Sequence, residues 1–129
     1  GNNAMVTSGQ LGRRLIEEVG SPNLKILWDP ANSLYCNEPA YPDGFEALRG
    51  GILGHIHMKD SNVQIARATV ECRELGTGQM APYLEPIAAG LKADGYDGAI
   101  SLESVYRPDG GTFEDGFRAS VKTLKAIFG

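Results

Sequence analysis

The sequence lacks three features that would place it in a large functional class. It has no excess of positive charge, because 12 basic and 16 acidic residues give a net charge of −4, and this argues against a nucleic-acid surface. It has no apolar run near the roughly 20 residues that cross a bilayer. Residues 1–5 have neither the charged nor the apolar region of a signal peptide. We therefore expect neither nucleic acid nor membrane as a partner.

Cysteine is also scarce. Cys36 and Cys72 are the only two, and their spacing matches neither a zinc site nor a redox pair. Isolated cysteines in a chain of this size are typical of reduced thiols, so we expect a cytoplasmic protein. The 129 residues, of which 42% are hydrophobic, suit a single domain.

Helical and extended patterns alternate along the chain, which is typical of an α/β protein with a parallel sheet covered by helices. Strands are predicted where short apolar runs end at a polar residue, and helices where apolar residues recur three and four positions apart. The predicted strands are residues 24–28, 52–58 and 99–102, and the predicted helices are 8–19, 44–49, 82–95 and 112–128.

Helix caps and apolar stripes support two of these helices. Thr7 or Ser8 can cap the first helix and Gly20 ends it, while Thr112 and Asp115 resemble a capping box for the last. The stripes that we expect to be buried are Leu11, Leu15, Ile16 and Val19 in the first helix, and Phe113, Phe117, Val121, Leu124 and Phe128 in the last. Between the elements, we expect a loop over residues 31–42 and an excursion over 60–77, with an edge strand or hairpin arm at 67–75.

Polar residues stand at the ends of all three predicted strands. These are Asp29, His57 with Lys59, and Glu103. Side chains alternate between the two faces of a strand, and the apolar neighbours of these residues should face the helices. Those neighbours are Ile26, Trp28, Ile56, Met58, Ile100 and Leu102. The four polar side chains should therefore point away from the helices, at the carboxyl ends where parallel α/β proteins carry their active sites.

An Asp, a His and a Glu at one edge of a sheet suit a divalent metal, and Mn, Mg, Co and Zn all accept such ligands. Each residue alone has an ordinary structural explanation. An Asp before Pro forms turns, a Glu at a strand end is often a solvated charge, and a strand histidine often pairs with a backbone carbonyl. Their joint occurrence at three consecutive strand ends favours a metal site.

Four segments in order resemble the xylose-isomerase-like barrel superfamily, the sugar phosphate isomerase/epimerase group that also includes family 2 of the apurinic (AP) endonucleases. They are ILWDPAN at 26–32, HIHMKD at 55–60, LGTG at 75–78 and GYDGAISLE at 95–103. The resemblance covers residues 8–124. It implies the C-terminal part of a (β/α)8 TIM barrel, with three core parallel strands, covering helices and no N-terminal strands, as one partial domain over residues 1–129.

The resemblance also implies roles for single residues. Asp29, His57 and Glu103 correspond to metal ligands, and Asn32 and His55 to substrate-binding residues. Lys59 is expected to contact a substrate oxygen or phosphate, or to form an ion pair with Asp60. Gly76 and Gly78 would either form a tight turn or bring backbone amides to a ligand, and Thr77 stands where the family commonly has Glu. A fourth ligand, a Glu ending the preceding strand, has no counterpart at residues 1–3.

The implied chemistry is proton abstraction beside a carbonyl, with Glu103 as the catalytic carboxylate and a metal stabilising the enediolate. The substrate would be a ketose, an aldose or an inositol-like polyol derivative. Two alternatives remain open. One is an apurinic-endonuclease-like phosphodiesterase, although two histidines are few for several metals and the net charge is acidic. The other is an inactive, truncated barrel.

Three strands do not close a barrel, which needs eight strands and about 250 residues. Open edges expose backbone groups and apolar side chains, so we expect a homo-oligomer. A competing possibility is that the 67–75 arm folds back over one edge and leaves a monomer.

Overall fold

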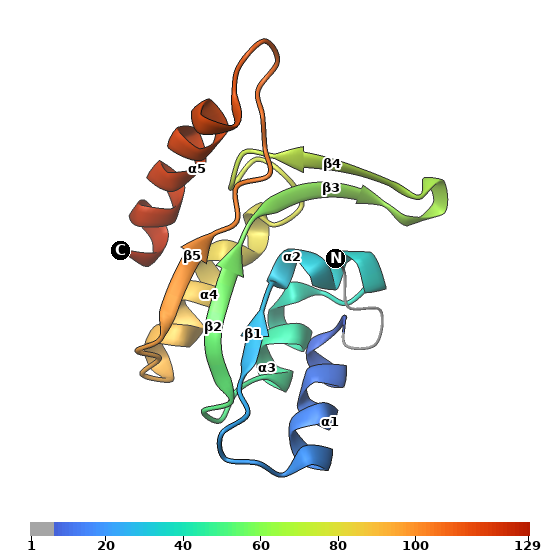
Figure 1. Ribbon diagram of the computed structural model, residues 1–129, viewed down its shortest axis with the longest axis vertical. Helices are drawn as coiled ribbons and strands as arrows, with labels where there is room; N and C mark the ends of the chain where they lie inside the picture. The colour runs from blue at the N-terminus through green and yellow to red at the C-terminus, as the bar shows by residue number, and fades with distance from the viewer. Residues whose placement is uncertain (1–6) are drawn as a thin grey trace.

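A three-stranded parallel sheet lies at the centre of the computed structural model, in the order β1-β2-β5 (Figure 1). The strands are β1 (Ile26–Trp28), β2 (Leu53–Met58) and β5 (Ala99–Leu102), each within a residue or two of its predicted bounds. In register, Trp28 stands beside Ile56 and Ile56 beside Ile100, so the three strands end close together. The mixed α/β class and the parallel sheet are confirmed.

The structure describes residues 7–129. The predictions about a signal peptide at residues 1–5 and about the missing fourth metal ligand at residues 1–3 lie outside the described residues. In the described part, no helix combines the length and the apolar character of a membrane span.

Three long helices flank the sheet: α1 (Gly9–Val19), α4 (Ala81–Ala93) and α5 (Phe113–Phe128). The predicted caps are present. The Ser8 hydroxyl accepts from the Leu11 amide at 3.1 Å, and Gly20 ends α1 in the left-handed conformation with φ of 61°. Thr112 and Asp115 form the reciprocal capping box of α5.

The segment predicted to be a loop at 31–42 is instead mostly helical. It contains α2 (Pro30–Ser33), η1 (Leu34–Cys36) and η2 (Ala40–Gly44), and α3 (Phe45–Ala47) follows directly. The reason is a tertiary contact. The Glu38 carboxylate accepts from the Gly9 amide at 2.7 Å and from the Ser33 hydroxyl at 3.0 Å, which ties the segment to the amino end of α1.

The predicted excursion is a hairpin of β3 (Asp60–Gln64) and β4 (Thr69–Arg73), joined by η3 (Ile65–Arg67). It forms its own antiparallel sheet and extends away from the three-stranded sheet (Figure 1), so it does not cover an edge of that sheet. The outer edge of β3 is occupied by Gln79, whose side chain accepts from the Val63 amide at 2.8 Å and donates to the Val63 carbonyl at 3.2 Å.

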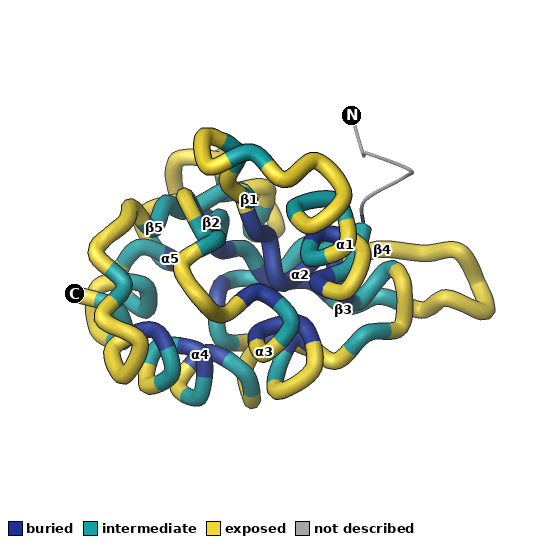
Figure 2. Tube along the Cα trace, turned by 90° about the horizontal axis from the view of Figure 1, so that it is seen from below, coloured by how far each residue is buried: buried dark blue, intermediate teal, exposed yellow. Residues whose placement is uncertain are grey.

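The core lies between the sheet and the helices, where buried residues of β1, β2, α3 and α4 meet (Figure 2). Trp28, Ile56 and Met58 are buried there, and Ile100 and Leu102 pack against them, as the alternation predicts. The opposite face of the sheet is more open, since Leu27 on β1 is 55% exposed.

Part of the predicted helix stripes is not buried. Phe113 and Phe117 in α5 are 61% and 45% exposed, and Leu11 and Val19 in α1 are also exposed. For α5 the cause is the side of the helix that faces inward. Its buried residues are Gly116 and Ser120, and a Cβ atom at Gly116 would lie 2.0 Å from the Tyr106 carbonyl oxygen. Phe113 and Phe117 each lie three residues before one of these positions, to one side of the inward face, and are turned toward the solvent. Leu124 and Phe128, further along the helix, reach the core.

The base of the hairpin is fixed by one buried carboxylate. Asp60 is 1% exposed and accepts four backbone amides, from Ser61 at 2.8 Å and from Gly76, Gly78 and Met80 at 2.9 Å each. A Cβ atom at Gly78 would lie 2.4 Å from Asp60 Oδ1, so only glycine permits this approach. The two glycines therefore form a tight turn, and their amides bind Asp60.

Replacing Asp60 by Asn should lower the free energy of unfolding by about 2–4 kcal/mol. The amide nitrogen of Asn would face two backbone N–H donors and leave them buried without an acceptor. Urea unfolding at one fixed protein concentration measures the change. Asp109→Asn is the matched control, because Asp109 is exposed, and it should shift stability by less than about 0.5 kcal/mol. Equal effects of the two variants would contradict this account of Asp60.

Candidate metal centre

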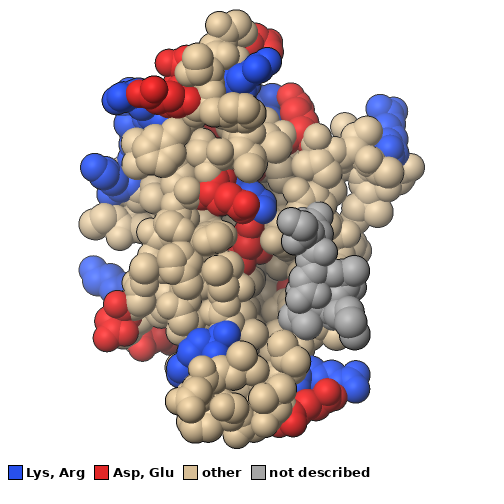
Figure 3. Space-filling model, viewed as in Figure 1, with Lys and Arg blue, Asp and Glu red and all other residues tan. Residues whose placement is uncertain are grey.

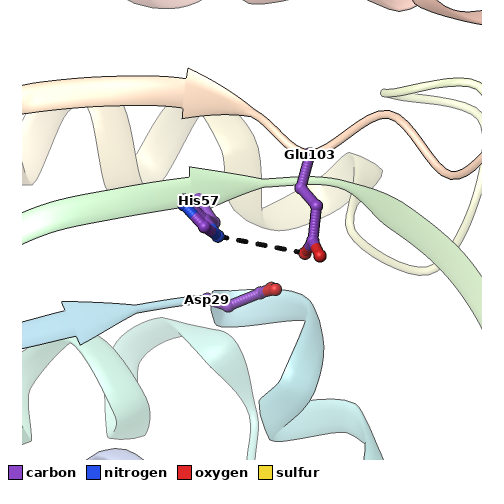
Figure 4. Close-up of side chains that lie close together, drawn as sticks. All are labelled: Asp29, His57 and Glu103. Carbon is purple, nitrogen blue, oxygen red and sulfur yellow. Dashed lines mark ion pairs between the residues drawn. The ribbon is translucent and has the colours of Figure 1, made fainter. Parts of the chain in front are cut away.

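Three predicted site residues converge at the carboxyl end of the sheet (Figure 4). Asp29 directly follows β1, His57 lies near the end of β2, and Glu103 directly follows β5. One ligand atom from each lies within 4.8 Å of the others. The alternation argument therefore placed these three side chains correctly, on the face opposite the helices.

Local structure fixes the two carboxylates. Asp29 is the N-cap of α2, and its Oδ1 accepts from the Ala31 amide at 3.1 Å, so its Oδ2 points toward the other two residues and Lys59. The Glu103 amide donates to the Met58 carbonyl at 2.9 Å, so the pairing with β2 continues one residue past the end of β5. Asp29 is buried, whereas the Glu103 side chain is 41% exposed.

Lys59 joins the two carboxylates. Its Nζ lies 2.5 Å from Asp29 Oδ2 and 2.7 Å from Glu103 Oε2, and its side chain is only 13% exposed. Acidic and basic atoms accordingly meet near the middle of the face shown in Figure 3, just beyond the strand ends of Figure 1. The alternative pairing of Lys59 with Asp60 is wrong, because the Asp60 carboxylate is used by backbone amides.

The environment shifts the pKa values of all three charged groups. Burial raises the pKa of Asp29 to about 6, against the opposing effect of the Lys59 ammonium. The hydrogen bond from Lys59 lowers the pKa of Glu103. Burial by itself lowers the pKa of Lys59, but its bonds to Asp29 and Glu103 outweigh burial, and the net direction is upward. Glu103 is therefore ionised at neutral pH.

The two histidines have different surroundings. His57 Nδ1 lies 4.0 Å from Glu103 Oε2, within the cluster. His55, two residues earlier on the same face, shares a 2.8 Å hydrogen bond with Ser101 Oγ and packs edge to face against the His57 ring at 5.1 Å. His55 does not line the cavity in front of the cluster, and its contact there is with the His57 ring.

A cavity of about 430 Å³ opens in front of the cluster. Asn32 lines it, and its Oδ1 is buried with no hydrogen-bond partner among residues 7–129. Tyr35 lines it too, and the sequence analysis did not select that residue. The signal was present, since Asn32 and Tyr35 are three residues apart and share a helical face, but it was missed because residues 31–42 were expected to be a loop.

Two carboxylate oxygens and one imidazole nitrogen are ligands that Mn, Mg, Co and Zn accept. Ligand atoms around one such ion at about 2.1 Å lie about 3.0–3.4 Å from their neighbours, so donors up to 4.8 Å apart would draw together by on the order of 1 Å, which side-chain rotation can supply. The donor set of Asp29, His57 and Glu103 therefore fits a divalent cation.

Solved structures share this fold. A xylose isomerase domain protein from Planctomyces limnophilus is 25% identical, with a TM-score of 0.70 over 95% of this chain and 42% of that chain. A D-psicose 3-epimerase, solved in the presence of D-fructose, is 19% identical, with a TM-score of 0.71 over 98% and 46% of the two chains. A 3-keto-D-glucoside 4-epimerase from E. coli is 22% identical, with a TM-score of 0.63 over 96% and 41%.

The chain thus spans less than half the length of each of these proteins, and its fold is part of a TIM barrel. A search among curated proteins found no match. The family profile described as "Xylose isomerase-like TIM barrel" matches residues 1–127, which is nearly the whole chain. The chain belongs to the xylose isomerase-like TIM barrel family.

Proposed function

We propose that this chain carries the metal-binding part of a sugar isomerase or epimerase, with Asp29, His57 and Glu103 as ligands of a divalent ion. One observation carries the proposal: three donors from three adjacent parallel strands converge at one mouth, within 4.8 Å of one another. Two of the similar folds belong to sugar epimerases, which supports a sugar as the substrate class. The donor set does not choose among Mn, Mg, Co and Zn.

A bound divalent ion would hold and polarise the carbonyl and hydroxyl oxygens of the substrate. Glu103 is the catalytic residue, because it is ionised and partly exposed at the cavity and can take the proton from the carbon beside the carbonyl, leaving an enediolate. Return of the proton to the neighbouring carbon gives the isomer. Its return to the opposite face of the same carbon gives the epimer. The substrate is a ketose, an aldose or an inositol-like polyol derivative.

Residues beside the three ligands bind the substrate or orient a ligand. Asn32 lines the cavity, and its side-chain amide can hydrogen-bond to a sugar hydroxyl there. Lys59 can reach a substrate oxygen from the same mouth. His55 acts through the orientation of His57, against whose ring it packs.

The active form is a homo-oligomer. Within residues 7–129, β1 and β5 each pair with a neighbour on one side only, so both edges of the parallel sheet have free backbone groups. The face opposite the helices exposes Leu27, although parallel sheets are normally covered on both faces. A second copy packed against this face or these edges would bury both. We expect the assembly to lie in the cytoplasm.

Metal binding tests the ligand set. Titration calorimetry with Mn²⁺ should give one weak site per chain, since three protein ligands are present. His57→Ala should abolish it, while the matched control His55→Ala, which keeps all three ligands, should only weaken it, by about tenfold. One-to-one binding that survives His57→Ala would show that the metal site lies elsewhere.

Proton exchange tests the reaction. Ketoses, aldoses and inositol derivatives incubated with the Mn²⁺-loaded protein in D₂O should gain deuterium at the carbon beside the carbonyl, as seen by NMR. Glu103→Gln should reduce this exchange by a factor on the order of 100–10,000, the usual worth of a general base. Exchange that persists in Glu103→Gln would contradict the role of Glu103.

Light scattering after size exclusion tests the assembly. The mass should be a multiple of the single-chain 13.8 kDa at micromolar concentration. Leu27→Lys should lower it, because a charge on the open face of the sheet would oppose burial. Val70→Lys is the control, because Val70 is similarly exposed but lies on the hairpin. A mass near 13.8 kDa for the unmodified chain across dilutions would rule out the oligomer.

A further inference from the structure

Lys59 has an unusual position for a lysine side chain. Its ammonium lies between Asp29 Oδ2 and Glu103 Oε2, at 2.5 and 2.7 Å, on the inner side of the strand ends. These are oxygens of the same two carboxylates that, with His57, form the candidate metal site. A cation that belongs to the protein therefore sits at the place where a divalent ion would bind.

The two cations exclude one another. A divalent ion bonded to both carboxylates would stand about 2.1 Å from an oxygen of each, in the space that the ammonium now fills. Close contact between two positive charges in a partly buried site is strongly unfavourable. Lys59 must leave the two carboxylates before the ion can take its place.

We infer that Lys59 is an exchangeable resident cation, which offsets part of the negative charge of the metal site when it is empty and is displaced into the substrate cavity when a divalent ion binds. This inference rests on the proposed function, because it takes Asp29, His57 and Glu103 as the metal ligands. It adds that metal affinity is set by competition with an internal lysine, and that the same lysine changes its role on binding.

The displaced ammonium can move into the cavity that Lys59 lines. Lys59 and Asn32 line the same cavity of about 430 Å³, so an ammonium that leaves the two carboxylates has space and a polar neighbour there. The long, flexible lysine side chain can turn toward this cavity while its backbone stays in place. It would then present its charge to whatever occupies the cavity.

The exchange also reverses the charge of the mouth. With Lys59 between them, two carboxylates and one ammonium leave a negative site. With a divalent ion added and the ammonium still nearby, the same mouth is positive. A positive mouth favours an anion, either the enediolate formed during the reaction or a phosphate group on the sugar. The substrate class that this site favours is therefore a sugar that is, or becomes, anionic.

Calorimetric titration with Mn²⁺ alone tests the competition. Lys59→Met should bind Mn²⁺ at least about tenfold more tightly than the unmodified chain, since no charge-assisted hydrogen bond has to be broken first. Lys25→Met is the matched control. Lys25 lines the same cavity but donates to the Gly51 carbonyl, so its loss removes the same charge without freeing the carboxylates. It should change the affinity by less than about threefold.

A second measurement needs no variant. Lysine acylation by an N-hydroxysuccinimide ester, read by mass spectrometry, should label Lys59 slowly without metal and several-fold faster with saturating Mn²⁺. The exposed Lys25 and Lys122 should label at the same rate in both states. The labelling experiment uses the unmodified chain, so it still tests the inference if Lys59→Met fails to fold.

The outcomes separate the two proposals. Equal Mn²⁺ affinity in the unmodified chain and Lys59→Met, or Lys59 labelling that Mn²⁺ leaves unchanged, would overturn the resident-cation inference and leave the metal site standing. Failure of both proteins to bind Mn²⁺ would overturn the metal site, and the inference with it. Tighter binding by Lys59→Met, together with faster labelling of Lys59 in Mn²⁺, is the expected result.

Discussion

Alternation of side chains along three adjacent parallel strands is the constraint on which the rest of this structure depends. It sends Trp28, Ile56 and Met58 into the helix-covered core and sends Asp29, His57 and Glu103 to the opposite face. Parallel pairing in register then brings the strand ends together, so residues distant in the sequence become neighbours. A register shift of one residue in any strand would exchange core and site side chains.

Placing two carboxylates this close has a cost that the structure offsets locally. Asp29 is buried, which disfavours its charge, and Glu103 stands nearby with the same sign. The Lys59 ammonium pairs with both carboxylates and offsets one of the two negative charges, and the amide of Ala31 at the start of α2 adds a donor to Asp29. The same electrostatic demand that attracts a divalent ion therefore also explains why a lysine occupies the mouth without one.

Features set by local sequence could be predicted, and features set by distant contacts could not. The caps at Ser8 and Thr112 and the polar strand ends follow from residues a few positions apart. The helical segment after Asp29 depends on Glu38 reaching Gly9, 29 positions away. The sequence could not decide whether Lys59 pairs with the adjacent Asp60. The amides that occupy the Asp60 carboxylate come from residues 76–80, and only the fold brings them close. Phe113 and Phe117 are exposed because α5 turns Gly116 and Ser120 inward instead, and the position of Tyr106 against Gly116 depends on the fold and not on the apolar stripe.

The hydrogen bonds that hold Asp60 determine which kind of motion can release the neighbouring Lys59. Lys59 and Asp60 are adjacent, and four backbone amides hold the Asp60 carboxylate, so the main chain beneath Lys59 cannot move without breaking that network. Any departure of the ammonium from Asp29 and Glu103 is therefore a change of side-chain rotamer, and its rate is limited by breaking the two ion pairs and not by motion of the backbone. Opening of the hairpin or the sheet, which takes microseconds or longer, is not required. The mouth can therefore change its charge with no hinge and no lid, on a fixed backbone.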